Sequence, residues 1–171
     1  MTLRLIKGLV AGAAGTAAMT GHQKLRERLA RRDAREEADG VTGEDSDQLD
    51  PWEAAPAPAQ VGKRLLEGVF EWRVPPEAIP VLTHVMHWSY GTLWGGAFVV
   101  GRDSSRSRRL LLGPLFGLTV WGASYAQLVP LGIYEPPWRY PLGSLADELG
   151  YHITYGSTVA LTYALVECLA A

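Results

Sequence analysis

Four stretches of the chain contain no Asp, Glu, Lys or Arg, and a strongly charged stretch lies between the first and the second. The uncharged stretches are residues 8–23, 78–101, 110–133 and 149–166. A helix needs roughly 20 apolar residues to cross a hydrocarbon core. With flanking residues included, the pattern predicts an all-α fold, an integral membrane four-helix bundle that forms a single membrane domain over residues 1–171. We expect its transmembrane helices at residues 3–23, 76–101, 110–133 and 142–169.

Residues 24–75 hold most of the charge and predict a loop between helices 1 and 2. Its first part, residues 24–38, keeps Leu25 and Leu29 at helical spacing, which indicates a solvated amphipathic extension of helix 1. An alternative is that the arginines of this extension bind an anionic lipid surface. Residues 39–60 are acidic and then rich in Pro and Ala, so we expect no packed core there.

A short amphipathic helix is predicted at residues 61–72. Its apolar residues recur at helical spacing, and the last of them is Trp72. Because Trp is enriched at membrane–water interfaces, we expect this helix to rest there. Pro75 and Pro76 then end it and open helix 2.

An internal repeat relates the two halves of the chain. Residues 87–91 and 152–156 both read H-x-[ST]-Y-G, and a proline stands 11 residues before each histidine. Helices 1 and 3 both begin with a G-x-x-x-G motif, which lets helices approach closely; the glycines are Gly8 and Gly12 in one copy and Gly113 and Gly117 in the other. The pattern predicts two helical-hairpin repeats related by an axis along the membrane normal.

Ionisable residues inside the uncharged stretches form the candidate site. His84 precedes His87 by one helical turn, and Glu148 precedes His152 by one turn. Ionisable groups inside a membrane are costly and usually face a bundle interior. We therefore expect these four residues to meet in one buried polar layer. Its predicted supporting residues are Gln127, Tyr90 and Tyr155.

Four roles for this layer remain open. It could be a hydrogen-bonded packing device. Three imidazoles and a carboxylate could bind a divalent transition metal. Two histidines at one depth could bind haem b. A histidine and glutamate relay could conduct protons or ions. No nucleophile elbow, Walker loop or dinucleotide fingerprint is present in the sequence, so no catalytic residue is predicted and enzymatic activity stays open.

Charge distribution predicts the orientation in the membrane. The loop from Arg102 to Arg109 contains four arginines, whereas the loop after helix 3 contains only Arg139. The positive-inside rule then places the first loop and both termini in the cytoplasm. Six Lys or Arg residues in the helix 1 extension argue for the opposite orientation. The single cysteine, Cys168, excludes an intrachain disulfide. No basic surface interleaved with aromatic residues is present to bind nucleic acid.

The segment from residue 129 to residue 156 resembles the end of the YagU-like family of inner-membrane proteins, a domain of unknown function. The matching residues are Pro130, Leu131, Gly132, Pro136, Pro137, Trp138, Glu148, Gly150 and His152. His84 or His87 resembles the histidine of the family's second helix. The resemblance implies a four-span protein of a bacterial-type inner (plasma) membrane, without implying a biochemical activity.

Taken together, these patterns favour a small four-span membrane protein whose buried His/Glu layer binds a metal or conducts protons or ions. One alternative is a haem- or metal-bearing subunit of a membrane redox system. Another is a structural or accessory subunit, in which the G-x-x-x-G faces contact a second copy or another membrane subunit. In each case the lipid bilayer is the expected partner.

Overall fold

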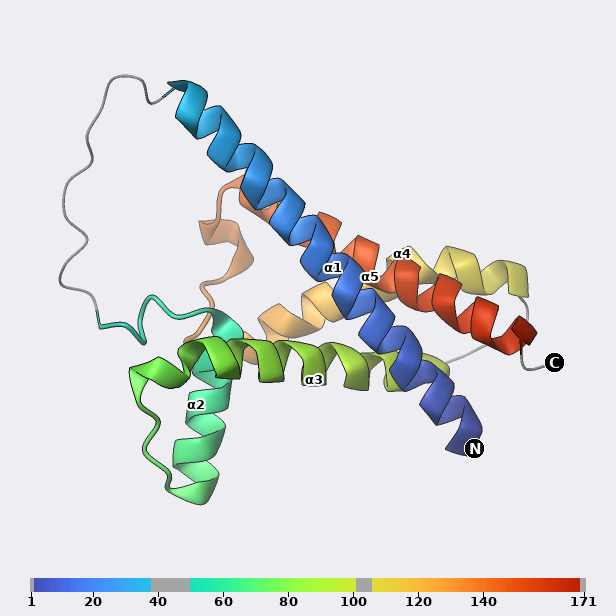
Figure 1. Cartoon of the computed structure of the whole chain (residues 1–171), viewed down its shortest axis with the longest axis horizontal. Coiled ribbons are helices and arrows are strands. Elements are labelled where there is room, and N and C mark those ends of the chain that lie inside the picture. Colours follow the sequence, from blue (N-terminus) through green and yellow to red (C-terminus); the bar gives the residue numbers. More distant parts are fainter. Residues whose placement is uncertain (1, 38–49, 101–105, 170–171) are drawn as a thin grey trace.

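A computed structural model describes residues 2–37, 50–100 and 106–169, and within these ranges the chain contains helices and no strand (Figure 1). The five α-helices are α1 (Thr2–Glu37), α2 (Ala57–Phe70), α3 (Ile79–Val100), α4 (Arg106–Leu128) and α5 (Leu142–Leu169). Two short 3-10 helices are η1 (Pro76–Ala78) and η2 (Pro137–Arg139). The predicted all-α fold is confirmed for the described residues.

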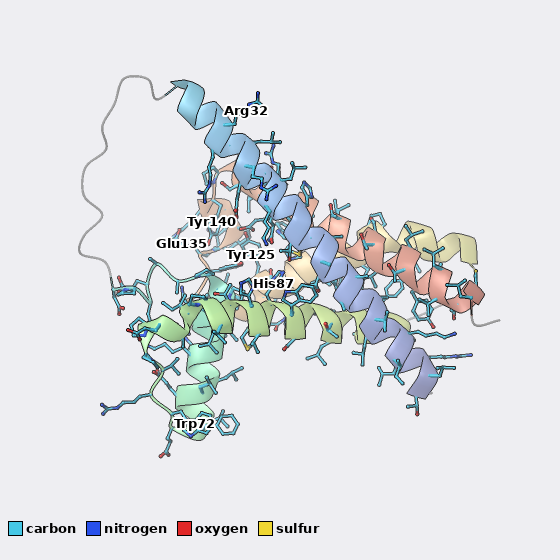
Figure 2. All side chains as sticks on the ribbon, viewed as in Figure 1. Arg32, Trp72, His87, Tyr125, Glu135 and Tyr140 are labelled. Atoms are coloured by element: carbon cyan, nitrogen blue, oxygen red, sulfur yellow. The ribbon has the colours of Figure 1, made fainter. Side chains whose placement is uncertain are left out.

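Helix α1 crosses the molecule diagonally and packs against both α3 and α5, while α4 packs along α5 (Figure 1). Helix α2 packs on α3 and projects away from the other helices. Trp72 follows its end and points outward (Figure 2). The start of α1 and the end of α5 lie at one end of the molecule, and α2 and residues 129–141 lie at the other.

The helix boundaries differ from the predicted ones where local turns end a helix early. Helix α4 ends at Leu128 rather than at residue 133. The backbone N–H groups of Ile133 and Tyr134 both donate to the carbonyl of Leu128, at 3.0 and 3.2 Å, while Gly132 adopts a φ of 64°. A glycine with positive φ beyond a helix end is a common way to satisfy its last carbonyls. Helix α5 has the predicted bounds, and the predicted extension of helix 1 is continuous with α1.

Part of the loop that we expected to lack a core is packed. Trp52, Ala55 and Ala59 are buried and contact apolar residues that follow α2; these are Val74, Ile79 and Leu82. The prediction underestimated how much surface one Trp buries when small alanines surround it. Helix α2 accordingly begins at Ala57, ahead of the predicted residue 61, and the acidic part of the loop at 39–49 lies outside the described residues.

No helix in the described part of the chain combines the length and the apolar character that crossing a membrane requires. This finding corrects the prediction of four transmembrane helices. The uncharged stretches contain many polar residues without charge, such as His84, Ser89 and Tyr90 in α3, and these residues lower the mean hydropathy. A stretch without charged residues is therefore not necessarily apolar enough to cross a membrane.

Glycine contacts join the helices into two pairs. In the α1–α3 pair, a Cβ added to Gly12 would lie 2.7 Å from the carbonyl oxygen of Gly91, so these backbones touch. In the α4–α5 pair, a Cβ added to Gly113 would lie 3.0 Å from the carbonyl oxygen of Gly156, and one on Gly117 would overlap the backbone of His152. Both copies of the repeated motif thus place their final glycine against a G-x-x-x-G glycine of the paired helix.

The main core lies where α1, α3, α4 and α5 meet. Tyr155, Val159 and Tyr163 of α5 are at most 2% exposed and form its centre. The hydroxyl of Tyr155 donates to the carbonyl oxygen of Gly91 at 2.5 Å, which links the two helix pairs. Glycine stripes bring the backbones close, and aromatic residues fill the space that remains between the pairs.

Candidate functional site

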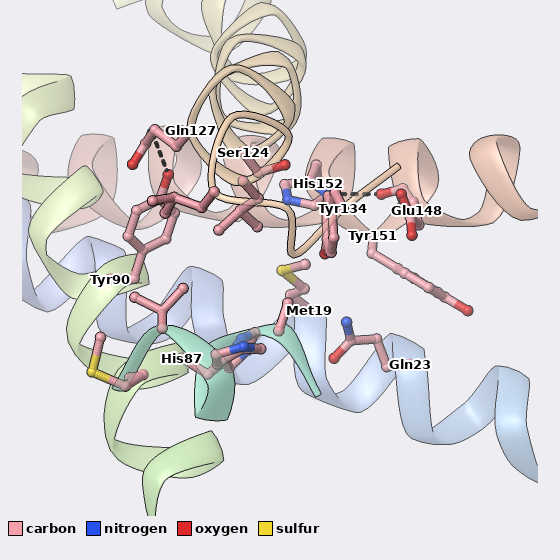
Figure 3. Close-up of a pocket in the computed structure, with 16 residues that line it drawn as sticks. Met19, Gln23, His87, Tyr90, Ser124, Gln127, Tyr134, Glu148, Tyr151 and His152 are labelled. Carbon is pink, nitrogen blue, oxygen red and sulfur yellow. Dashed lines mark hydrogen bonds between the residues drawn. The ribbon is translucent and has the colours of Figure 1, made fainter. Parts of the chain in front are cut away.

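A cavity of about 410 Å³ opens at the end of this core that faces α2 (Figure 3). Side chains from all five helices and from the turn after α4 line it. Apolar residues supply much of the wall, including Met19, Met86, Leu128 and Leu131. The lining residues with polar side chains are Gln23, His87, Tyr90, Ser124, Gln127, Tyr134, Glu148, Tyr151 and His152. Below, this cavity is called the chamber.

Glu148 is the only Asp, Glu, Lys or Arg residue among the described residues that line the chamber. The hydroxyl of Tyr125, a buried residue of α4, donates to Oε2 of Glu148 at 2.7 Å. Burial and the neighbouring carboxylate both raise the pKa of Tyr125, so its phenol remains a hydrogen-bond donor. One carboxylate oxygen is therefore held by α4, and the hydrogen bond fixes the orientation of the other.

His152 lies one turn after Glu148 on α5. Its Nδ1 is 2.8 Å from the backbone carbonyl oxygen of Glu148. A carbonyl oxygen can only accept, so Nδ1 carries the hydrogen and Nε2 of the neutral ring keeps a lone pair. Burial lowers the pKa of His152, although the nearby carbonyl and carboxylate of Glu148 oppose this shift. At neutral pH the ring is thus an uncharged hydrogen-bond acceptor.

His87 holds a comparable position on α3. Its Nε2 lies 3.4 Å from Oγ1 of Thr20, and the Thr20 hydroxyl donates to the carbonyl oxygen of Thr16 at 2.8 Å. The threonine oxygen can then only accept from the ring, which leaves the lone pair of His87 on Nδ1. Burial lowers the pKa of His87, and the charges that His152 and His84 would carry lower it further.

Tyrosine rings surround these groups. Tyr134 lines the chamber, and its ring centroid is 5.2 Å from that of Tyr125. Burial, followed by the charge of Glu148, raises the pKa of Tyr134 to about 12. On the opposite wall, the amide nitrogen of Gln127 donates to the hydroxyl oxygen of Tyr90 at 3.0 Å (Figure 3). The chamber therefore combines one carboxylate, two neutral imidazoles and several neutral phenols.

The second half of α1 closes one side of the chamber. Nδ1 of His22 lies 2.9 Å from Oγ1 of Thr154, and the His22 ring meets the edge of Tyr151 at a centroid distance of 5.0 Å. Further along, Nη2 of Arg26 contacts Oδ1 of Asp147 at 2.5 Å on the exposed surface. These contacts fix the crossing of α1 over the start of α5.

The structure brings together most of the predicted layer. His87, Glu148, His152, Gln127 and Tyr90 line the chamber. Two predicted members lie elsewhere: the side chain of His84 is exposed, and Tyr155 belongs to the main core.

Three tyrosines at the chamber were absent from the predicted set, namely Tyr125, Tyr134 and Tyr151. Two of them could have been predicted from the sequence. Tyr151 is next to His152, and Tyr134 lies in the turn rich in aromatic residues and prolines.

The predicted metal and haem sites do not fit these side chains. No group of three or more His, Cys, Asp or Glu residues in the described ranges is placed to hold a metal ion. His84, one of the three imidazoles expected in the site, is exposed, and Oε2 of Glu148 already accepts from Tyr125. Ligation of haem b by both histidines is also not favoured, since Nε2 of His87 faces Thr20.

No protein-family model, curated protein or solved structure matches the chain. Membership of the YagU-like family accordingly stays a prediction from residues 129–156.

Proposed function

We propose that the protein is a membrane-associated helical bundle that binds a small cation in the chamber beside Glu148. The observation that carries this function is the isolation of one carboxylate among uncharged side chains. Glu148 is half-buried, and a carboxylate that is partly withdrawn from water is stabilised by a partner of opposite charge. The hydrogen bond from the Tyr125 hydroxyl satisfies one carboxylate oxygen, and a bound cation would compensate the charge.

Association with a bilayer is supported by the outer faces of the bundle. Large apolar side chains are exposed on all four long helices; examples are Leu3 at 64%, Leu93 at 67%, Leu115 at 57% and Leu165 at 53%. Extensive exposed apolar surface is typical of sites that contact a membrane or a partner. Close glycine contacts between helices, as seen in both pairs, are a packing mode common in lipid. Association of this kind does not require any single helix to cross the bilayer.

Flotation with lipid vesicles tests this association. We expect the full chain to float with vesicles of phosphatidylcholine and phosphatidylglycerol, and Leu93→Ser combined with Leu165→Ser to reduce the floating fraction at least threefold. The matched control is Glu53→Ser with Arg139→Ser, which alters two exposed polar positions without changing net charge. A wild-type protein that stays at the bottom of the gradient would exclude the membrane-associated function.

Cation binding at Glu148 is tested by thermal unfolding at one fixed pH in the presence of sodium or a small ammonium ion. A ligand that binds only the folded state adds about 2.7 kcal/mol of stability at 100 times its Kd. We expect Tm to rise with at least one of these cations in the wild type and not in Glu148→Gln, where the amide oxygen can still accept from Tyr125. Asp147→Asn is the control, because this neighbouring carboxylate is exposed and bonds Arg26. Equal responses of the wild type and Glu148→Gln would rule out the chamber as a cation site and leave the packing or accessory role.

A further inference from the structure

We propose that the chamber binds a primary alkylammonium ion, with the ammonium group beside Glu148 and the alkyl chain against the apolar wall. This inference rests on the proposed cation-binding function and names its ligand class. Four features of the chamber support it: net charge, hydrogen-bonding capacity, wall composition and size.

The charge of the chamber matches a monocation. Glu148 supplies one negative charge, and no Lys or Arg is among the described lining residues. The two basic side chains found near it are exposed and engaged: Arg26 pairs with Asp147, and Arg64 donates to the backbone carbonyl of Leu131, whose residue lines the chamber. An anionic ligand would face an uncompensated carboxylate, and a dication would bring one charge more than the chamber neutralises.

The hydrogen-bond acceptors of the chamber match a ligand that donates several N–H bonds. A primary ammonium has three N–H donors and no acceptor. The chamber offers acceptors in the second carboxylate oxygen of Glu148 and in the imidazole lone pairs. In His152, Nδ1 donates to a backbone carbonyl, so the lone pair is on Nε2. In His87, Nε2 donates to Thr20, so the lone pair is on Nδ1. The lowered pKa values of both histidines keep the rings uncharged beside a bound cation.

The composition of the wall and the volume of the chamber favour a small ligand with an apolar part. Tyrosine rings on two sides supply aromatic surface that attracts a cation. Methionine and leucine side chains then provide an apolar surface for an alkyl chain. A volume of about 410 Å³ is near the lower end for small-molecule pockets, which begin at roughly 300 Å³. An alkylammonium with a short chain therefore satisfies the charge, the acceptors and the space together.

Titration calorimetry with n-butylammonium tests the ligand class on the purified full chain in detergent. 1-Butanol replaces the ammonium by a neutral group, and tetramethylammonium keeps the charge without N–H donors. We expect n-butylammonium to bind at least tenfold more tightly than either compound. Glu148→Gln should weaken its binding at least tenfold, whereas Asp147→Asn should leave it unchanged. Ser124→Phe, which fills the chamber and keeps the carboxylate, should also weaken binding and gives a second variant if Glu148→Gln does not fold.

Each contrary result overturns a specific part of this inference. Butanol binding as tightly as butylammonium would show an apolar cavity without charge recognition. Tighter binding of tetramethylammonium would show recognition by aromatic faces rather than by hydrogen bonds. If butylammonium does not bind while sodium still raises Tm through Glu148, the ligand class is wrong and the proposed function stands. If no cation depends on Glu148, both are wrong.

Discussion

At the scale of single residues, the state of each histidine is set by its neighbours rather than by its own sequence motif. His87 and His152 open identical motifs, yet one presents Nε2 to a threonine and the other presents Nδ1 to a backbone carbonyl. Burial lowers the pKa of both, so the folded protein holds them neutral where an unfolded chain would begin to protonate them. Their burial therefore couples folding to pH.

Stability should fall as the pH drops below about 6.5, the ordinary pKa of histidine in an unfolded chain. Because both folded pKa values are lowered, the unfolded chain binds more protons in this range. Stability is then complete above the unfolded pKa and is lost as the pH falls toward the folded values. Each histidine can contribute a slope of at most about 1.4 kcal/mol per pH unit.

Urea unfolding between pH 5 and pH 8 measures this slope. We expect the slope in the acidic part of the range to be smaller in His87→Gln with His152→Gln than in the wild type. Identical slopes for the two proteins would show that these histidines titrate as they do in the unfolded chain.

At the scale of elements, glycines decide which helices pair. Gly117 and Gly122 lie on the same helix, but only Gly117 contacts another backbone; nothing lies within 4 Å of a Cβ added to Gly122. This contrast separates the effect of helix contact from the intrinsic effect of glycine on a helix.

Replacing each of these glycines by Ala should change stability in opposite directions. Gly117→Ala forces α4 away from α5 and should cost roughly 1–3 kcal/mol, as overpacking of a close contact does. Gly122→Ala should stabilise by roughly 0.5–1 kcal/mol, because Ala restricts the unfolded chain and favours the helix. Denaturant unfolding measures the free energy of unfolding of both variants. A stabilising Gly117→Ala would contradict the close approach of the two helices.

The elements and their pairing were largely predictable, and the site was predictable in part. Uncharged runs and prolines located the helices, and the repeated glycines at 8, 12, 113 and 117 marked the faces that meet. Membrane spans were not predictable from missing charge, because His, Ser, Thr and Tyr lower hydropathy without it. Helical spacing placed His84 beside His87, yet only the packing of α1 and α2 determines which of the two is covered. Tyr125 was not predicted as a site residue, because its hydrogen bond to Glu148 depends on the register between α4 and α5.

At the scale of the whole molecule, α1 is the element that joins the two pairs. It contacts α3 and α5 along its length, and its charged half crosses over the start of α5. Both an exposed ion pair and a buried core hold it there. Exposed ion pairs contribute little, typically about 0–1 kcal/mol, while burying a Val side chain contributes roughly 1.5–3 kcal/mol. The apolar core should therefore dominate.

Two substitutions compare these contributions directly. Arg26→Ala removes the ion pair with Asp147 and should lower the free energy of unfolding by less than about 1 kcal/mol. Val159→Ala removes two methyl groups from a fully buried side chain that faces Gly15 of α1 and should cost roughly 1.5–3 kcal/mol. Urea unfolding measures both. A larger loss for Arg26→Ala would mean that charge, rather than the core, positions α1.

The two copies of the repeat differ at one position that bears on how the chamber evolved. Four residues before the motif histidine, the second copy has Glu148 and the first copy has Thr83, whose hydroxyl donates to its own helix at Ile79. If the two halves arose by duplication, they have since diverged at this position, and among the described residues Glu148 lines the chamber whereas Thr83 does not. Divergence at this single position would have changed the chemistry of the chamber while leaving the glycine scaffold of both halves intact.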